Sequence, residues 1–146
     1  SVNYGAGRLG EGGEIVQMIS VDAYCEQNHI TRLDLMKVDV EGSEPLVFYG
    51  AKNTIRSMQP AILYERNYNT VTSSMRRVLQ LDDDIGGFDV EKWCGECGYF
   101  AKIRLPKDNF LILNEDKWKM CDTSLFRPTD IVEDGLRCFD YLTPKW

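Results

Sequence analysis

The chain has one histidine, and it lacks a basic surplus, long apolar runs and an even number of cysteines, features that mark several common protein classes. With His29 alone and no partner motif around it, a histidine-based catalytic triad has no support. The formal net charge of −6 argues against binding to nucleic acid, whose phosphate backbone attracts clustered Lys and Arg. Because no apolar run reaches the roughly 20 residues needed to cross a bilayer, we expect no membrane span.

Cysteine occurs in an odd number and is widely scattered. Small secreted scaffolds usually carry an even number that pairs into disulfides. The first residues also lack the basic start and apolar core of a secretory signal. We therefore expect a reducing compartment, such as the cytoplasm. The five cysteines are Cys25, Cys94, Cys97, Cys121 and Cys138.

Two of these cysteines form a C-x-x-C pair, Cys94 and Cys97. A structural zinc site needs two further ligands, usually in a second tight pair, and the other cysteines are isolated. A redox pair normally lies at the start of a helix, whereas this one falls near the end of a helix expected over residues 89–97. We therefore predict neither a disulfide between these two residues nor bound zinc.

The chain opens with a polar, glycine-rich stretch, residues 1–14, which we expect to be a flexible loop. Residues 5–10 match the dinucleotide fingerprint G-x-G-x-x-G. That fingerprint requires a strand before it and a helix after it. Here E-G-G follows, which is a poor helix start, so a dinucleotide enzyme remains the weaker alternative.

The central feature of the sequence is a mainly apolar run over residues 33–40. Asp39 lies near the end of this run, and Glu41 and Gly42 follow it directly. A continuous apolar run is typical of a buried parallel strand. Gly42 allows a tight turn, and the S-E-P that follows suits the cap and first turn of a helix. In open α/β sheets, ligands bind at this end of a strand.

A second unit repeats the layout. The apolar residues 61–65 end in Glu65, and a helix expected over 44–58, interrupted at Gly50 and stopped by Pro60, joins the two strands. Strands joined in this way form a βαβ unit with a parallel sheet. If the two strands are neighbours, Glu65 lies beside Asp39 and Glu41 at the same edge of the sheet.

Asp39 and Glu41 also have simpler interpretations. An Asp before a helix often serves only as its cap, and a Glu near a helix start often only complements the helix dipole. The pattern thus predicts one α/β domain over residues 1–146 and leaves the role of each acid open.

Elsewhere the pattern predicts shorter elements. Residues 15–21 favour a strand, and Asp22 suits the cap of a short helix over 23–28. The segment from Lys117 is rich in aromatic residues and has no predicted structure; it could pack on the sheet or dock a protein partner. The remaining expectations are helices over 72–81 and 89–97, a solvated acidic turn at 82–87, and an antiparallel hairpin over 99–113.

Three stretches together resemble the FkbM-type methyltransferases: K-V-D-V-E-G-S-E at residues 37–44, Gly-Ala at 50–51, and P-A-I-L-Y-E at 60–65. The preceding I-S-V-D-A-Y at 19–24 is similar to the family's strand that ends in a Leu-Asp pair. The resemblance is specific over residues 15–67 and architectural beyond them. It implies part of a class I, Rossmann-like methyltransferase sheet, with a C-terminal antiparallel hairpin.

The resemblance also implies a function. It points to methyl transfer from S-adenosylmethionine to a hydroxyl of a sugar, glycan or small metabolite. By motif match, Asp39 would act as base or orient the acceptor, Glu41 would orient it or support the turn, and Glu65 would contact it. The sequence requires no metal here, although a divalent cation between Asp39 and Glu65 is conceivable.

One departure limits the resemblance. The family's acidic, glycine-rich cofactor loop and its ribose-binding strand are expected upstream, so no cofactor-binding residue can be assigned. The chain therefore resembles the C-terminal portion of such an enzyme, active where the full protein supplies the cofactor half. The alternative is a degenerate module, kept as a structural or binding piece.

Overall fold

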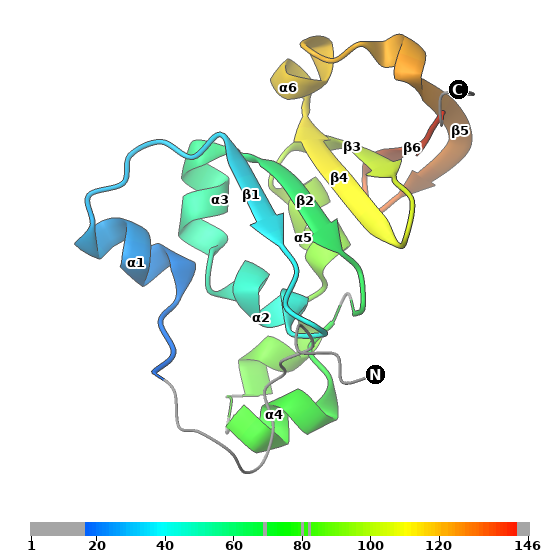
Figure 1. The fold of residues 1–146 in the computed structure, drawn as a ribbon. Coiled ribbons are helices and arrows are strands. Elements are labelled where there is room, and N and C mark those ends of the chain that lie inside the picture. Colours follow the sequence, from blue (N-terminus) through cyan, green and yellow to red (C-terminus); the bar gives the residue numbers. More distant parts are fainter. Residues whose placement is uncertain (1–16, 69, 80, 82, 143–146) are drawn as a thin grey trace, which may run out of the picture.

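The computed structural model describes residues 17–68, 70–79, 81 and 83–142. The expected loop at 1–14, with its G-x-G-x-x-G run, lies outside the described residues. The six strands of the described part form one mixed sheet in the order β1-β2-β4-β3-β6-β5 (Figure 1). They are β1 (Leu35–Val38), β2 (Ala61–Glu65), β3 (Tyr99–Arg104), β4 (Asn109–Asn114), β5 (Phe126–Glu133) and β6 (Leu136–Tyr141).

The helices are short. The α-helices are α1 (Val21–Gln27), α2 (Glu44–Tyr49), α3 (Lys52–Met58), α4 (Ser73–Leu79), α5 (Val90–Glu96) and α6 (Glu115–Lys119). Two 3₁₀ turns complete the set: η1 (Asp83–Gly87) and η2 (Thr123–Leu125). Within the described residues, no helix has both the length and the apolar character to cross a membrane.

The predicted βαβ unit is confirmed. β1 and β2 pair in parallel, with Leu35 opposite Ala61, and α2 and α3 connect them. Gly50 caps α2, and its N–H donates to the carbonyl of Leu46 at 2.9 Å, so the connection is interrupted where the sequence predicted. A Cβ on Gly50 would lie 3.1 Å from Cβ of Ser20, so glycine fits this close approach without displacing Ser20.

Burial along β1 differs from the expected two-sided pattern. Met36 and Val38 are buried, whereas Leu35 is 57% exposed. β1 lies at the edge of the described sheet, and its buried side chains belong to a core that includes Phe48 of α2 and Ile55 of α3. One face of this strand is therefore packed and the other is open, which gives alternation instead of continuous burial.

The predicted strand over 15–21 is wrong in the part that the structure describes. Residues 17–20 form no strand, and Val21 begins α1. Ser20 supplies the cap by accepting a hydrogen bond from the N–H of Ala23 at 3.1 Å. A local cap thus fixes a helix start where the apolar pattern favoured a strand.

Asp22 is a cap, but of a different helix from the predicted one. Its carboxylate accepts from the backbone N–H groups of Asn53 at 3.0 Å and Thr54 at 2.8 Å. Those groups lie in the first turn of α3, where backbone donors lack partners within the helix. Asp22 therefore fastens α1 to the crossover.

The predicted hairpin is confirmed, and the aromatic segment after it extends the sheet. β3 and β4 pair antiparallel, β6 pairs with β3 in parallel, and β5 forms the outer edge. Figure 1 shows β5 curving at this outer edge of the sheet. Trp118 of α6 lies 4.2 Å from Phe139 and 5.6 Å from Phe126 between ring centroids. This second cluster packs on the face opposite the main core.

A charged network lies inside the protein. Lys102 of β3, with only 5% of its side chain exposed, donates to Glu91 of α5 at 2.6 Å and to Glu133 of β5. The other oxygen of Glu91 accepts from the hydroxyl of Tyr64 at 2.7 Å and from Arg66 at 3.2 Å. Burial raises the pKa of Glu91, but the hydrogen bonds from Lys102 and Tyr64 outweigh it and hold the pKa below its ordinary value.

Candidate functional site

The turn after β1 has an unusual backbone. Glu41 and Gly42 both adopt positive φ, 51° and 100°, and only glycine does so without a steric cost. A Cβ on Gly42 would lie 3.1 Å from Cε2 of Tyr68, so the ring also restricts this position to glycine. The turn therefore carries strain at Glu41, which the surrounding contacts must offset.

Glu44 holds the turn from beneath. Its side chain is fully buried, and Oε1 accepts from the N–H of Gly42 at 2.9 Å and from Nδ2 of Asn67 at 3.2 Å. Oε2 has no hydrogen-bond partner among the described residues. Ser43, predicted as the cap of α2, makes no such hydrogen bond there. The Glu44 carboxylate thus ties the turn after β1 to the loop after β2, a role that the sequence did not reveal.

The structure brings the three predicted acids together. Asp39, Glu41 and Glu65 each offer a carboxylate oxygen, and these oxygens lie within 4.8 Å of one another. The parallel register explains the meeting, because Val38 is opposite Tyr64, which places Asp39 and Glu65 side by side at the carboxyl ends of the two strands. We call Asp39, Glu41 and Glu65 the acidic edge.

The acids at this edge differ electrostatically. Nζ of Lys37 donates to Asp39 at 2.7 Å, and this hydrogen bond and charge lower the pKa of Asp39. Partial burial, followed by the charge of Asp39 and a hydrogen bond with it, raises the pKa of Glu65. Asp39 is therefore the group that stays ionised, and Glu65 is the group that more readily holds a proton.

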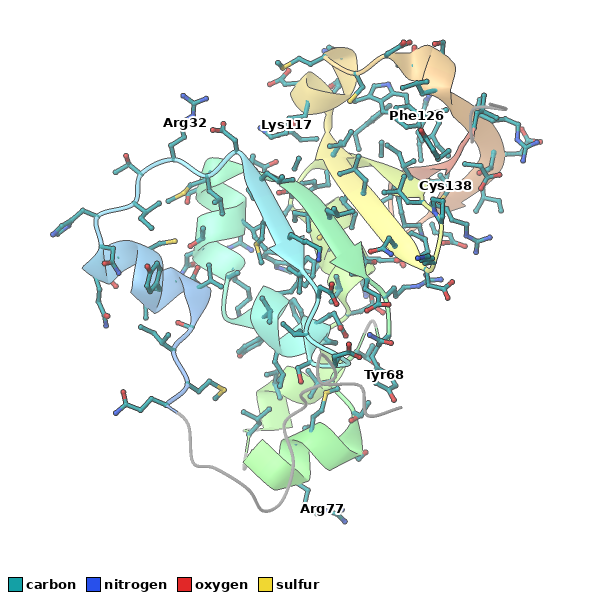
Figure 2. All side chains as sticks on the ribbon, viewed as in Figure 1. Arg32, Tyr68, Arg77, Lys117, Phe126 and Cys138 are labelled. Atoms are coloured by element: carbon teal, nitrogen blue, oxygen red, sulfur yellow. The ribbon has the colours of Figure 1, made fainter. Side chains whose placement is uncertain are left out.

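This arrangement suits the binding of hydroxyl groups. An ionised carboxylate can accept a hydroxyl proton, and a protonated one can donate a hydrogen bond. Tyr68 is 50% exposed and covers Gly42, and Figure 2 shows it beside the ends of β1 and β2. Three oxygens this close could also share one hard cation such as Mg²⁺. The acidic edge thus combines proton acceptors with an exposed ring.

Two other sequence candidates have structural roles. His29 is exposed, with φ of 53°, in the turn that ends α1, as a turn residue is expected to be. In the C-x-x-C pair, Cys94 is fully buried, and all five cysteines are free thiols. A Cβ on Gly95 would lie 1.9 Å from the carbonyl oxygen of Asp134, so the glycine between the cysteines allows α5 to pack against the β5–β6 turn.

Comparison with known proteins adds a family assignment. The family model of the methyltransferase FkbM domain matches residues 4–99, a segment that contains the whole acidic edge and ends at the start of β3. No curated protein and no solved structure matches the chain. Since the matched segment covers well over half of the 146 residues, the chain belongs to the FkbM methyltransferase domain family.

Proposed function

We propose that this chain forms the acceptor side of a methyltransferase that moves a methyl group from S-adenosylmethionine to a hydroxyl of a sugar or small metabolite. The observation that carries the proposal is the acidic edge, where Asp39 is held ionised beside a Glu65 of raised pKa. The family assignment supports methyl transfer as the class of reaction.

The described residues at this edge do not fit the cofactor itself. S-adenosylmethionine, when bound, supplies an electrophilic methyl group on a sulfonium sulfur. A glycine-rich cradle works by letting a ligand approach bare backbone, but the ring of Tyr68 covers Gly42. The roles that follow therefore concern the acceptor alone.

Asp39 is the proposed base. Its carboxylate would accept the hydroxyl proton as the acceptor oxygen forms its bond to carbon, and the hydrogen bond from Lys37 keeps it ionised over a wide pH range. Glu41 and Glu65 would hold the remaining hydroxyls of the acceptor. Much of the benefit comes from orientation, since a displacement requires the attacking oxygen in line with the leaving group.

The test is Asp39→Asn in the full-length protein, assayed by transfer of a labelled methyl group to a panel of sugars and small alcohols. Asn keeps the shape of the side chain but does not accept a proton usefully, so we expect kcat to fall about 10²–10⁴-fold. The matched control is Asp34→Asn, an exposed acid paired with Arg32 just before the other end of β1. Equal kcat in the two variants would contradict the role of Asp39.

The rival interpretation, a non-enzymatic module, makes a different prediction. It predicts that the full-length protein transfers no methyl group to any acceptor of the panel. For the isolated 146-residue chain, we expect no saturable binding of S-adenosylmethionine in calorimetry, because the ring of Tyr68 covers the bare backbone at Gly42. Saturable binding to this chain would show that its own residues form the cofactor site.

A further inference from the structure

A pocket with a volume of about 550 Å³ lies among α2, α3, α5 and the end of η1, and shares no residue with the acidic edge. We call it the aromatic-basic pocket. Its size falls within the range typical of small-molecule sites. Its lining includes three aromatic rings, two cations and one glycine: Tyr49, Phe88, Trp93, Lys52, Arg56 and Gly87.

The aromatic residues form a continuous wall. Phe88 lies edge-on to Tyr49, with 5.4 Å between ring centroids, and 5.7 Å from Trp93. Trp93 is buried, whereas Tyr49 and Phe88 are each half-buried. These contacts join α2, the end of η1 and α5. The wall is therefore fixed by core packing while part of its ring surface faces the pocket.

Two cations line the same pocket from one helix. Nζ of Lys52 lies 3.8 Å from the centre of the Tyr49 ring, and Cζ of Arg56 lies 5.9 Å from that of Trp93. They are four residues apart on α3, a spacing at which like charges repel. Neither cation forms an ion pair with the side chains that the structure describes.

Within the described part of the chain, these two cations contact aromatic rings and not carboxylates. With a net charge of −6, acidic groups outnumber basic ones. Yet the two cations face the aromatic wall, where contact with ring faces orients them. An anion entering the pocket would relieve the repulsion between Lys52 and Arg56 and accept charge-assisted hydrogen bonds from both.

We propose that the aromatic-basic pocket binds a small molecule that joins a planar ring to a phosphate, as a mononucleotide does. Lys52 and Arg56 would hold the phosphate, and the exposed parts of Tyr49 and Phe88 would contact the ring. Gly87 is exposed, and a Cβ on it would meet open space, so the approach beside it is clear. This site is separate from the acidic edge and does not depend on the proposed methyl transfer.

The test is calorimetry of the full-length protein with AMP, adenosine and inorganic phosphate as separate probes. We expect saturable binding of AMP that is tighter than that of either fragment, because ring and phosphate act together. The double variant Lys52→Met/Arg56→Met should weaken AMP binding about tenfold or more. The charge-matched control, Lys92→Met/Lys107→Met, changes two exposed lysines outside the pocket and should leave it unchanged.

A second variant, Gly87→Leu, keeps both cations and should block the pocket sterically. Its backbone needs no positive φ and its Cβ has space, so we expect it to fold, with circular dichroism as the check. AMP binding that persists in both the double variant and Gly87→Leu would overturn the proposal. No saturable binding of AMP, or equal affinity for AMP and phosphate, would also overturn it.

Discussion

Two groups of charged side chains meet at β2, the buried network around Glu91 and the acidic edge. They differ in whether opposite charges balance one another. In the buried network, both oxygens of Glu91 have partners, and Lys102 and Arg66 supply the opposite charge. At the acidic edge, three carboxylates converge and Lys37 is their one cation among the described ion pairs. The first group compensates its charges, and the second crowds like charges together.

The comparison distinguishes charges that hold the fold together from charges that the proposed function would use. A compensated buried network holds elements together, and this one links α5, β2, β3 and β5. Crowded carboxylates oppose folding because each raises the cost of ionising the next, and at Glu65 the charge of Asp39 adds to partial burial in raising the pKa. Clusters of that kind are typical of functional sites, where stability is given up for activity.

The largest expected effect comes from breaking the buried network. Lys102→Met leaves Glu91 buried without its nearest cation, and we expect a loss of about 3–5 kcal/mol in the free energy of unfolding, measured by urea denaturation. A matched substitution on the surface, Lys119→Met, removes an exposed i,i+4 pair with Glu115 and should cost about 0.5 kcal/mol or less. Similar losses in the two variants would contradict the role of the network.

A smaller effect is expected at the turn beneath the acidic edge. The Gly42→Ala variant must adopt φ of 100° and meets the ring of Tyr68, so we expect a loss of about 1–3 kcal/mol in the free energy of unfolding. Gly87→Ala is the control, because its Cβ meets open space and it needs no positive φ. If urea denaturation finds Gly42→Ala as stable as Gly87→Ala, position 42 does not require glycine.

The smallest effect should have the opposite sign. The folded pKa of Glu65 is raised above its ordinary value of 4.5, so its ionisation costs stability as the pH rises through that range. Glu65→Gln should therefore raise the melting temperature slightly at pH 7, and the gain should shrink below that ordinary pKa, where the wild-type carboxyl is also neutral. Glu26→Gln, an exposed acid on α1, is the control.

A lower melting temperature for Glu65→Gln at pH 7 would show that the acidic edge is stabilising and would remove the contrast with the buried network. A gain that persisted unchanged at acidic pH would assign the effect to packing instead of charge.

Much of the fold could be predicted where local signals agree. Pro60 precedes the apolar run and Glu65 ends it, and the bounds of β2 agree with both signals. Asp89 caps the start of α5, where the sequence predicted a helix. The interruption at Gly50 and the hairpin turn at 106–109 also rest on residues with strong local preferences. These elements need little information from distant parts of the chain.

The remaining features depend on distant contacts. The position of α1 against α3 is fixed partly by Asp22, whose partners lie 31 and 32 residues away. β5 is exposed along most of its length and lacks the alternation that marks a half-buried strand, so its pairing with β6 was not predictable. The contact of Glu44 with Asn67 also joins residues that are distant in the chain, 23 positions apart. The helix-start pattern around Glu44 therefore could not predict it.

The most direct test of the acidic edge is a carboxyl-carbon NMR titration of Asp39 and Glu65 in the wild type and in Asp39→Asn. We expect the pKa of Asp39 below 3.8 and that of Glu65 above 4.5 in the wild type. In Asp39→Asn, the pKa of Glu65 should fall toward its ordinary value, because the neighbouring charge is gone. Ordinary pKa values for both groups, or a Glu65 pKa indifferent to the substitution, would contradict the coupled pair on which the proposed function rests.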